Sequence, residues 1–304
     1  MFLSACNKNR STESADDTIT VGIAKLIAHP ALDMMEKGVI DELAEQGFDN
    51  ITIDLQNANG DVNTNAEIAN HFKNNKTDVV VAITSTTVLA MAHKMKDTPI
   101  IFVGVTDPVD IGVRTTLEPE ETNITGISDM PPVRDEIMLI KKILPDVKRI
   151  GNIYSPGETN SVTQMELAKG ICEELGIELV VSPVHNTAEV KQAAEVLAPK
   201  VDAFFVSKDN YVVAALNSLT NTAMAHKVPV ISADTTSAPD SKVLAAYGLD
   251  TYLTGRAAGK LVARVLKGEN PGTIAVRNPD ELSSYVNPEV AAELGITLPD
   301  GLFE

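Results

Sequence analysis

The feature that most constrains the fold is the alternation of short apolar runs with amphipathic segments from about residue 18 almost to the C-terminus. Runs of this kind predict strands, and segments with apolar residues at helical spacing predict helices. Their alternation is typical of βαβ units and parallel sheets. A first series predicts strands at 18–23, 51–55, 79–84 and 100–105, and helices at 31–46, 62–75 and 86–96.

A second series repeats this architecture without clear sequence repetition. It begins after a run at 125–128 and predicts strands at 150–154, 179–184, 203–207 and 230–232, with helices at 131–143, 161–175, 188–197 and 212–226. The C-terminal part of the sequence, after the second series, predicts strands at 243–249 and 273–277 and helices at 251–266 and 288–294. These last elements are too few for a third domain, so we assign them to both halves.

Length and composition favour two domains, because 304 residues with 44% apolar content can bury two cores. We predict an α/β protein of two lobes with parallel central sheets. The first lobe comprises 18–126 and 250–278, and the second 127–249 and 279–304. Crossings near 125–129, 247–250 and 278–283 then form a three-crossing hinge.

The N-terminus carries the pattern Leu3-Ser4-Ala5-Cys6, at which bacterial lipoprotein precursors are cut and lipidated on the cysteine. The polar residues that follow predict a flexible tether over 1–17. We therefore expect an extracytoplasmic protein, in the periplasm or on the outer face of the membrane, attached through lipid on Cys6 alone. The alternative is an N-terminal segment whose cysteine is accidental.

Charge and cysteine content exclude several other classes. A net charge of −17 argues against nucleic-acid binding, which needs a basic face. No apolar run reaches the ~20 residues of a membrane span. Cys6 and Cys172 do not make a disulfide framework, and Cys172 falls in an apolar helical stripe where a buried thiol is expected.

Polar residues follow most predicted strands, where open α/β sheets bind their ligands. Helix capping explains about half of them. Capping does not explain three carboxylates, Asp107, Asp129 and Asp209, at strand ends that should face one crevice.

Several strings, in this order and spacing, resemble the ABC-transporter substrate-binding lipoproteins of the tryptophan-binding type. The strings are His29–Asp33, Val105–Val109, Asn123–Asp129, Tyr154–Ser161, Asp209–Asn210, Tyr247–Tyr252 and Asn287–Ile296. The resemblance implies two Rossmann-like lobes of the type-1 periplasmic binding protein fold that close on a small molecule. It also implies delivery to an ABC permease in the membrane by a monomeric protein, with an amino acid, tryptophan or phenylalanine, as the favoured ligand. Lys25 and Thr86 depart from the pattern expected for the family.

An amino acid needs partners for an ammonium, a carboxylate and a side chain. Asp129 and Asp209, one from each lobe, are the leading partners for the ammonium. Ser85 and Thr86, or Asn160 and Ser161 across the cleft, suit the carboxylate. The remaining candidates are His29 and Tyr154 for an aromatic side chain, and Thr106, Asp107, Asn210 and Asp234 around the same cleft.

Other functions find less support in the sequence. The sequence lacks the G-x-G-x-x-G, H-E-x-x-H and G-x-S-x-G signatures that would point to an enzyme. Gly255–Lys260 fits a packed helix better than a phosphate loop. His29 and Asp33 alone make a poor metal site, so neither metal nor cofactor is expected. A repressor would carry a basic helix-turn-helix before the first lobe, where this sequence has the short polar segment 1–17. A sensor that presents its ligand to a membrane receptor stays an open alternative.

Overall fold

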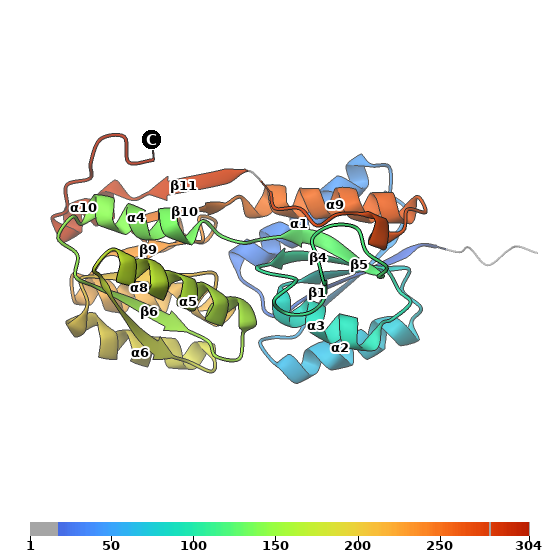
Figure 1. Cartoon of the computed structure of the whole chain (residues 1–304), viewed down its shortest axis with the longest axis horizontal. Coiled ribbons are helices and arrows are strands. Elements are labelled where there is room, and N and C mark those ends of the chain that lie inside the picture. The colour runs from blue at the N-terminus through green and yellow to red at the C-terminus, as the bar shows by residue number, and fades with distance from the viewer. Residues whose placement is uncertain (1–17, 280, 304) are drawn as a thin grey trace, which may run out of the picture.

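Two sheets lie at opposite ends of the long axis of the molecule (Figure 1), in a computed structural model that describes residues 18–279 and 281–303. Sheet A has the order β2-β1-β3-β4-β5 and is parallel throughout. Its strands are β1 (Thr20–Lys25), β2 (Thr52–Asn57), β3 (Val79–Ile83), β4 (Ile100–Val105) and β5 (Ile124–Ser128). Together with its covering helices it forms what we call the first lobe.

Helices cover both faces of sheet A, which is why its central strands are apolar on both faces. The helices are α1 (Pro30–Glu45), α2 (Val62–Asn74), α3 (Ser85–Lys94) and α9 (Thr251–Leu266). Leu32 and Val39 of α1 pack with Val262 of α9 on one face. Phe72 of α2 and Met91 of α3 pack on the other face.

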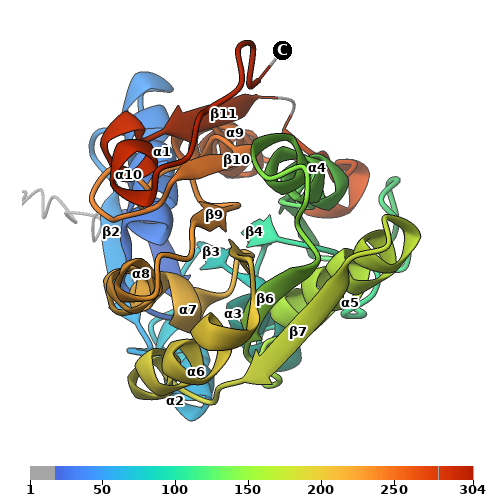
Figure 2. The ribbon, with the colours of Figure 1, turned by 90° about the vertical axis from the view of Figure 1, so that its left-hand side faces the viewer.

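Sheet B has the order β11-β10-β9-β8-β6-β7, and only the edge strand β11 runs antiparallel to its neighbour. Its strands are β6 (Arg149–Tyr154), β7 (Glu178–Pro183), β8 (Ala203–Val206), β9 (Val230–Ser232), β10 (Ala245–Leu249) and β11 (Leu282–Val286). Figure 2 shows β11 and β10 side by side at the edge opposite β7. Sheet B with its helices forms the second lobe.

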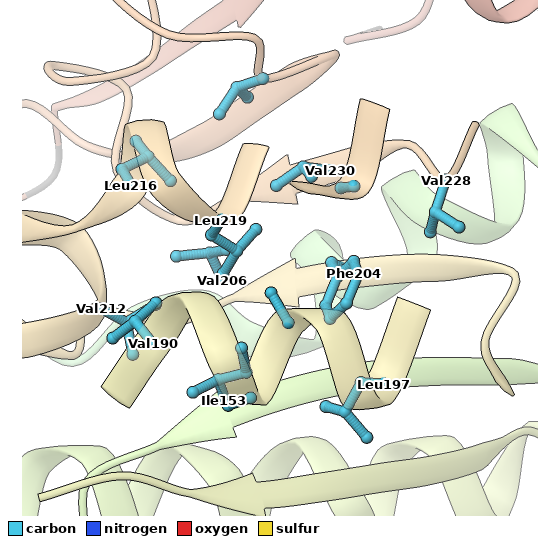
Figure 3. Close-up of a cluster of buried hydrophobic side chains, with 14 of the residues drawn as sticks. Ile153, Val190, Leu197, Phe204, Val206, Val212, Leu216, Leu219, Val228 and Val230 are labelled. Carbon is cyan, nitrogen blue, oxygen red and sulfur yellow. The ribbon is translucent and has the colours of Figure 1, made fainter. Parts of the chain in front are cut away.

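Two layers of helices also enclose sheet B. They are α4 (Val133–Ile143), α5 (Thr159–Glu174), α6 (Val190–Leu197), α7 (Asn210–Ala214), α8 (Leu216–Ala225) and α10 (Pro288–Leu294). Figure 3 shows the layer in which Val190 and Leu197 of α6 and Leu219 of α8 lie against Phe204 of β8. Cys172 lies on the other side with Ile140, where burial raises the pKa of its thiol to about 11, as expected for an inert core cysteine.

The chain crosses between the lobes three times. It leaves β5 of sheet A for α4, leaves β10 of sheet B for α9, and returns to β11 after Arg277, which pairs with Ile127 of β5. The α/β architecture expected from the sequence is therefore confirmed.

Three element predictions were wrong in detail. The strand expected at 273–277 is a 3-10 turn over Pro271–Thr273 followed by a single bridge, because Arg277 alone pairs with β5. The crossing expected at 278–283 already contains the start of β11. The helix expected over 212–226 divides at Ala215 into α7 and α8.

Helices α1 and α9 approach closely through glycines. A Cβ on Gly255 would lie 2.2 Å from the Met35 carbonyl oxygen, and one on Gly38 would lie 2.4 Å from that of Tyr252. Backbone atoms cannot yield as a flexible side chain can, so these glycines set the spacing of the two helices.

Gly255→Ala should therefore destabilise the protein by about 1–3 kcal/mol, since overpacking outweighs the helix propensity gained. The matched control is Gly170→Ala in α5, where nothing lies within 4 Å of the added Cβ. The control should gain up to about 1 kcal/mol. Urea unfolding of both variants measures the difference, and equal stabilities would contradict this account of the helix seam.

Candidate functional site

A cavity lies between the lobes at the carboxyl ends of strands from both sheets. The atom-free space there, part of it open to solvent, is about 450 Å³. The lining residues are His29, Ala31, Leu32, Met35, Thr84, Gly104, Thr106, Asp129, Asn160, Lys208, Asp209, Asn210, Val213, Asp234 and Thr251.

Direct contacts join the two lobes around this cavity. Gln164 Nε2 of α5 donates to Thr106 Oγ1 after β4 at 3.1 Å. The Tyr211 hydroxyl of α7 donates to the Gly60 carbonyl at 2.7 Å. Lys208, after β8, forms an ion pair with Asp129, after β5. The lobes are thus held together at the site in this structure.

The Asp129–Lys208 pair is almost fully buried. Burial raises the pKa of the Asp129 carboxyl, while Lys208 opposes that rise. Removing one partner of such a pair leaves an uncompensated buried charge, which is strongly destabilising. Lys208 therefore makes a charged Asp129 possible in the cavity wall.

Asp209 is already hydrogen-bonded within its own lobe. Its carboxylate accepts from Ser155 Oγ at 2.9 Å, Ser161 Oγ at 2.6 Å and the Val212 backbone N–H at 2.9 Å. The last bond caps α7. Asp209 lines the cavity, but most of its acceptor capacity is used by these three donors.

Asp234, after β9, has a free acceptor. Its Oδ1 accepts from the backbone N–H groups of Thr236 and Ser237 at 2.9 and 3.3 Å. Its Oδ2 is buried and has no hydrogen-bond partner within residues 18–279 and 281–303. A buried carboxylate oxygen without a donor is costly, so a ligand donor would stabilise it.

Two further unpaired polar atoms belong to lining residues. Asn160 donates through Nδ2 to the Lys208 carbonyl at 3.0 Å, while its Oδ1 has no partner in the described part of the chain. His29 Nε2 lies 3.3 Å from Asn210 Oδ1 of the other lobe, and Nδ1 is likewise unpartnered among the described residues. The cavity thus offers two buried oxygen acceptors, Asp234 Oδ2 and Asn160 Oδ1, that suit ligand donors.

Thr84, the N-cap of α3, adopts an unusual backbone conformation in the cavity wall. Its φ of 88° and ψ of 157° fall in a region that is essentially restricted to glycine. Its Oγ1 accepts from the Thr87 backbone N–H at 3.5 Å. The strained backbone therefore lies where α3 begins, at the rim of the cavity.

The structure brings seven of the twelve predicted ligand residues to this cavity and not the other five. The seven are His29, Thr106, Asp129, Asn160, Asp209, Asn210 and Asp234. Ser161 is bonded to Asp209 and does not line the cavity itself, and Ser85, the first residue of α3, is fully buried. Thr86 faces a separate groove beside Gly157, because it lies one step further along α3.

Asp107 and Tyr154 also lie outside the lining set. Asp107 Oδ1 accepts from the backbone N–H groups of Val109 and Asp110 at 2.9 and 3.0 Å, so its turn holds it. Tyr154 is half-buried at the end of β6, where its backbone pairs with Pro183 of β7. The lipidation predicted at Cys6 lies outside the described residues.

Sequence reasoning missed the apolar wall of the cavity. Leu32 and Met35 of α1 pack in the core of the first lobe and also line the cavity. Lys208 carried a signal in the sequence, since it stands directly beside Asp209 at the end of a predicted strand, where a cation can pair with a carboxylate.

Glu136, near the start of α4, is fully buried close to Asp129 and Lys208, and neither of its carboxyl oxygens has a partner among the described residues. Burial raises its pKa from 4.5 to about 8. The folded protein therefore holds a proton that the unfolded chain releases above pH 4.5. Stability contributed by this group is complete below that pH and is lost as the pH rises toward 8.

Glu136→Gln should remove this pH dependence, because glutamine stays neutral. We expect the wild-type free energy of unfolding to fall by a few kcal/mol more than that of the variant between pH 5 and pH 8. Urea unfolding at both pH values measures it. Glu289→Gln, at an exposed helix start, is the control. Parallel curves for Glu136→Gln and wild type would show that Glu136 is not protonated in the fold.

Within the described residues no helix is long and apolar enough to cross a membrane. No cluster of three or more potential metal-ligating side chains occurs over 18–279 and 281–303.

Comparisons with known proteins bear on the chain as a whole. Residues 20–304 match a family described as ABC transporter substrate binding protein. A tyrosine-binding protein of Clostridioides difficile is 34% identical over 95% of this chain and 84% of its own length.

Two solved structures resemble the fold. An ABC domain in complex with L-Trp from Streptococcus pneumonia has a TM-score of 0.90 at 33% identity, covering 94% of this chain and 97% of that one. A ligand-free, open substrate binding protein with adhesive properties from Clostridium difficile has a TM-score of 0.70 at 32% identity, covering 93% and 97%. At similar identity, the chain superposes better on the ligand-bound relative.

Proposed function

The chain belongs to the ABC transporter substrate binding protein family, and from that premise we propose that it is the solute-binding component of an ABC importer for an aromatic amino acid. The ligand would occupy the cavity between the lobes. The observation that carries this proposal is the buried, unpaired carboxylate oxygen of Asp234 in a cavity that also contains Asp129 and Asp209. A cationic group with several N–H donors suits such a site.

The ammonium of an amino acid would lie against Asp234. One oxygen of Asp129 is paired with Lys208, whose positive charge opposes an ammonium there, and both oxygens of Asp209 accept from two serine hydroxyls and a backbone N–H. Asp234 retains a free oxygen. We therefore assign it the role that the sequence had suggested for Asp129 and Asp209.

The carboxylate would lie at the start of α1. Ala31 and Leu32 line the cavity there, and His29 at the N-cap makes no side-chain cap. Free N–H groups and the helix dipole favour an anion at the start of such a helix.

An aromatic side chain is supported by the apolar wall and by the relatives. Leu32, Met35 and Val213 form an apolar part of the lining. The relatives include a tyrosine-binding protein and a structure in complex with L-Trp. We propose the same ligand class here.

Closure of the lobes around the ligand is the proposed mechanism. We assign sheet A with its helices to one moving lobe and sheet B with its helices to the other. The boundary expected between 126 and 127 falls inside β5, and Asp129, whose backbone N–H bonds to the Val105 carbonyl, stays with the first lobe. The interlobe contacts and the better superposition on the ligand-bound relative support a closed form in this structure. In this proposal the protein acts outside the cytoplasm as a monomer, held to the membrane by lipid on Cys6, and delivers its ligand to a permease.

L-Tyrosine, L-tryptophan or L-phenylalanine should raise the melting temperature, because ligand binds the folded, closed form and not the unfolded chain. At a ligand concentration of about 100 Kd the stabilisation is about 2.7 kcal/mol. Differential scanning fluorimetry of the twenty amino acids, with isothermal titration of those that shift, provides the measurement. No shift with any of them would refute the amino-acid assignment.

Asp234→Asn should lower affinity for the amino acid roughly tenfold to a hundredfold, since it removes a charge-assisted bond worth about 1.5–3 kcal/mol. Asparagine can still accept from Thr236 and Ser237, so folding should persist. Asp107→Asn, outside the cavity lining, is the matched control and should bind as wild type. Unchanged affinity in Asp234→Asn would remove Asp234 from the ammonium site.

A further inference from the structure

We propose that Glu158 positions His29 as a hydrogen-bond acceptor for the ligand, acting across the interlobe cleft through the side-chain amide of Asn210. Glu158 precedes α5 in the second lobe, and His29 precedes α1 in the first. The proposal rests on the proposed function for the identity of the ligand, and it adds a second acceptor beside Asp234.

Glu158 fixes which way the Asn210 amide points. Its Oε2 accepts hydrogen bonds from Asn210 Nδ2, from Asn160 Nδ2 at 3.3 Å and from the Asn210 backbone N–H at 3.4 Å. Glu158 is 1% exposed, so water does not compete for these bonds. With its nitrogen directed at Glu158, Asn210 presents its oxygen to His29.

That oxygen in turn selects the tautomer of His29. Asn210 Oδ1 lies 3.3 Å from His29 Nε2, and a carbonyl oxygen can only accept, so Nε2 carries the hydrogen. A neutral imidazole protonated at Nε2 has its lone pair at Nδ1. Burial lowers the pKa of His29, which keeps the ring neutral.

His29 Nδ1 is then a buried acceptor without a donor. The ring lines the cavity, and Nδ1 has no partner in the part of the chain that the structure describes. The charged groups that influence the ring are Asp234, Asp33 and Lys25, of which Asp234 also lines the cavity and retains an unpaired oxygen. His29 and Asp234 line the same cavity, so the two acceptors suit two N–H bonds of a single primary ammonium group.

The arrangement also makes the site depend on closure. Glu158 and Asn210 belong to the second lobe, and His29 to the first, so the tautomer is fixed only when the lobes meet. In this way the second lobe determines what the first lobe offers to the ligand.

The experiment compares Glu158→Gln and Glu158→Leu with wild type. Glutamine can accept from Asn210 through its amide oxygen, whereas leucine cannot, and then the Asn210 amide is free to turn its nitrogen toward His29. Nitrogen-15 NMR of labelled histidine reports the tautomer of His29, without and with saturating L-tyrosine or L-tryptophan. Isothermal titration of the same two amino acids gives the affinities, and urea unfolding checks the fold of each variant.

We expect His29 in the wild-type complex to be protonated at Nε2 alone, with Glu158→Gln matching it and binding within about twofold. Glu158→Leu should show both tautomers and bind about tenfold more weakly. A proton on Nδ1 in the wild-type complex, or a Glu158→Leu variant with wild-type tautomer and affinity, would overturn the proposal.

Failure of the proposed function is recognisable separately, since then neither amino acid binds the wild type. The spectrum of the protein alone decides in that case, because protein contacts between the lobes bring Asn210 to His29 in this structure. Protonation at Nε2 in the wild type and in Glu158→Gln, with both tautomers in Glu158→Leu, supports the positioning role, and any other pattern overturns it. If Glu158→Leu does not fold, Glu158→Met takes its place in both measurements, because methionine also cannot accept a hydrogen bond from Asn210 in the way that a carboxylate does.

Discussion

Burial of carboxylates between the two lobes is the constraint on which the rest of the site depends. Asp129, Asp209 and Asp234 line one cavity, and a charge removed from water must be paired or hydrogen-bonded. Asp129 is paired with Lys208, and Asp209 accepts from three donors of its own lobe. Asp234 Oδ2 is fully buried and has no partner in the described structure. The proposed ligand is the missing partner, which gives closure a physical driving force.

The sequence predicted the fold well because its main signal is local. Apolar runs such as Val79–Ile83 and Ile100–Val105 are buried on both faces, and this leaves a clear mark in composition. Strand β11 was missed because Leu282–Val286 contains two serines and is a strand only through its pairing with β10. The break at Ala215 was missed because apolar spacing continues through it.

The sequence predicted where the site lies but not which of its carboxylates are paired within the protein and which remain free for a ligand. Polar strand ends were correctly expected at the cavity, since parallel strands direct their carboxyl ends to one edge. The sequence could not show that Ser155 and Ser161 would reach Asp209, or that Lys208 would reach Asp129 across the cleft. These pairings depend on how the lobes are placed, which no local pattern encodes. The proposed exchange of roles between Asp209 and Asp234 follows from them.

The seam between α1 and α9 has a consequence for the order in which the chain can fold during synthesis. All five strands of sheet A are complete at Ser128, yet α9 ends at Leu266. Until α9 is made, the face of α1 around Gly38 has nothing to cover it, and the apolar side chains that pack with Val262 stay in water. The ribosome must therefore finish nearly the whole second lobe before the first can reach its full stability. A chain built this way stays incompletely folded for most of its translation.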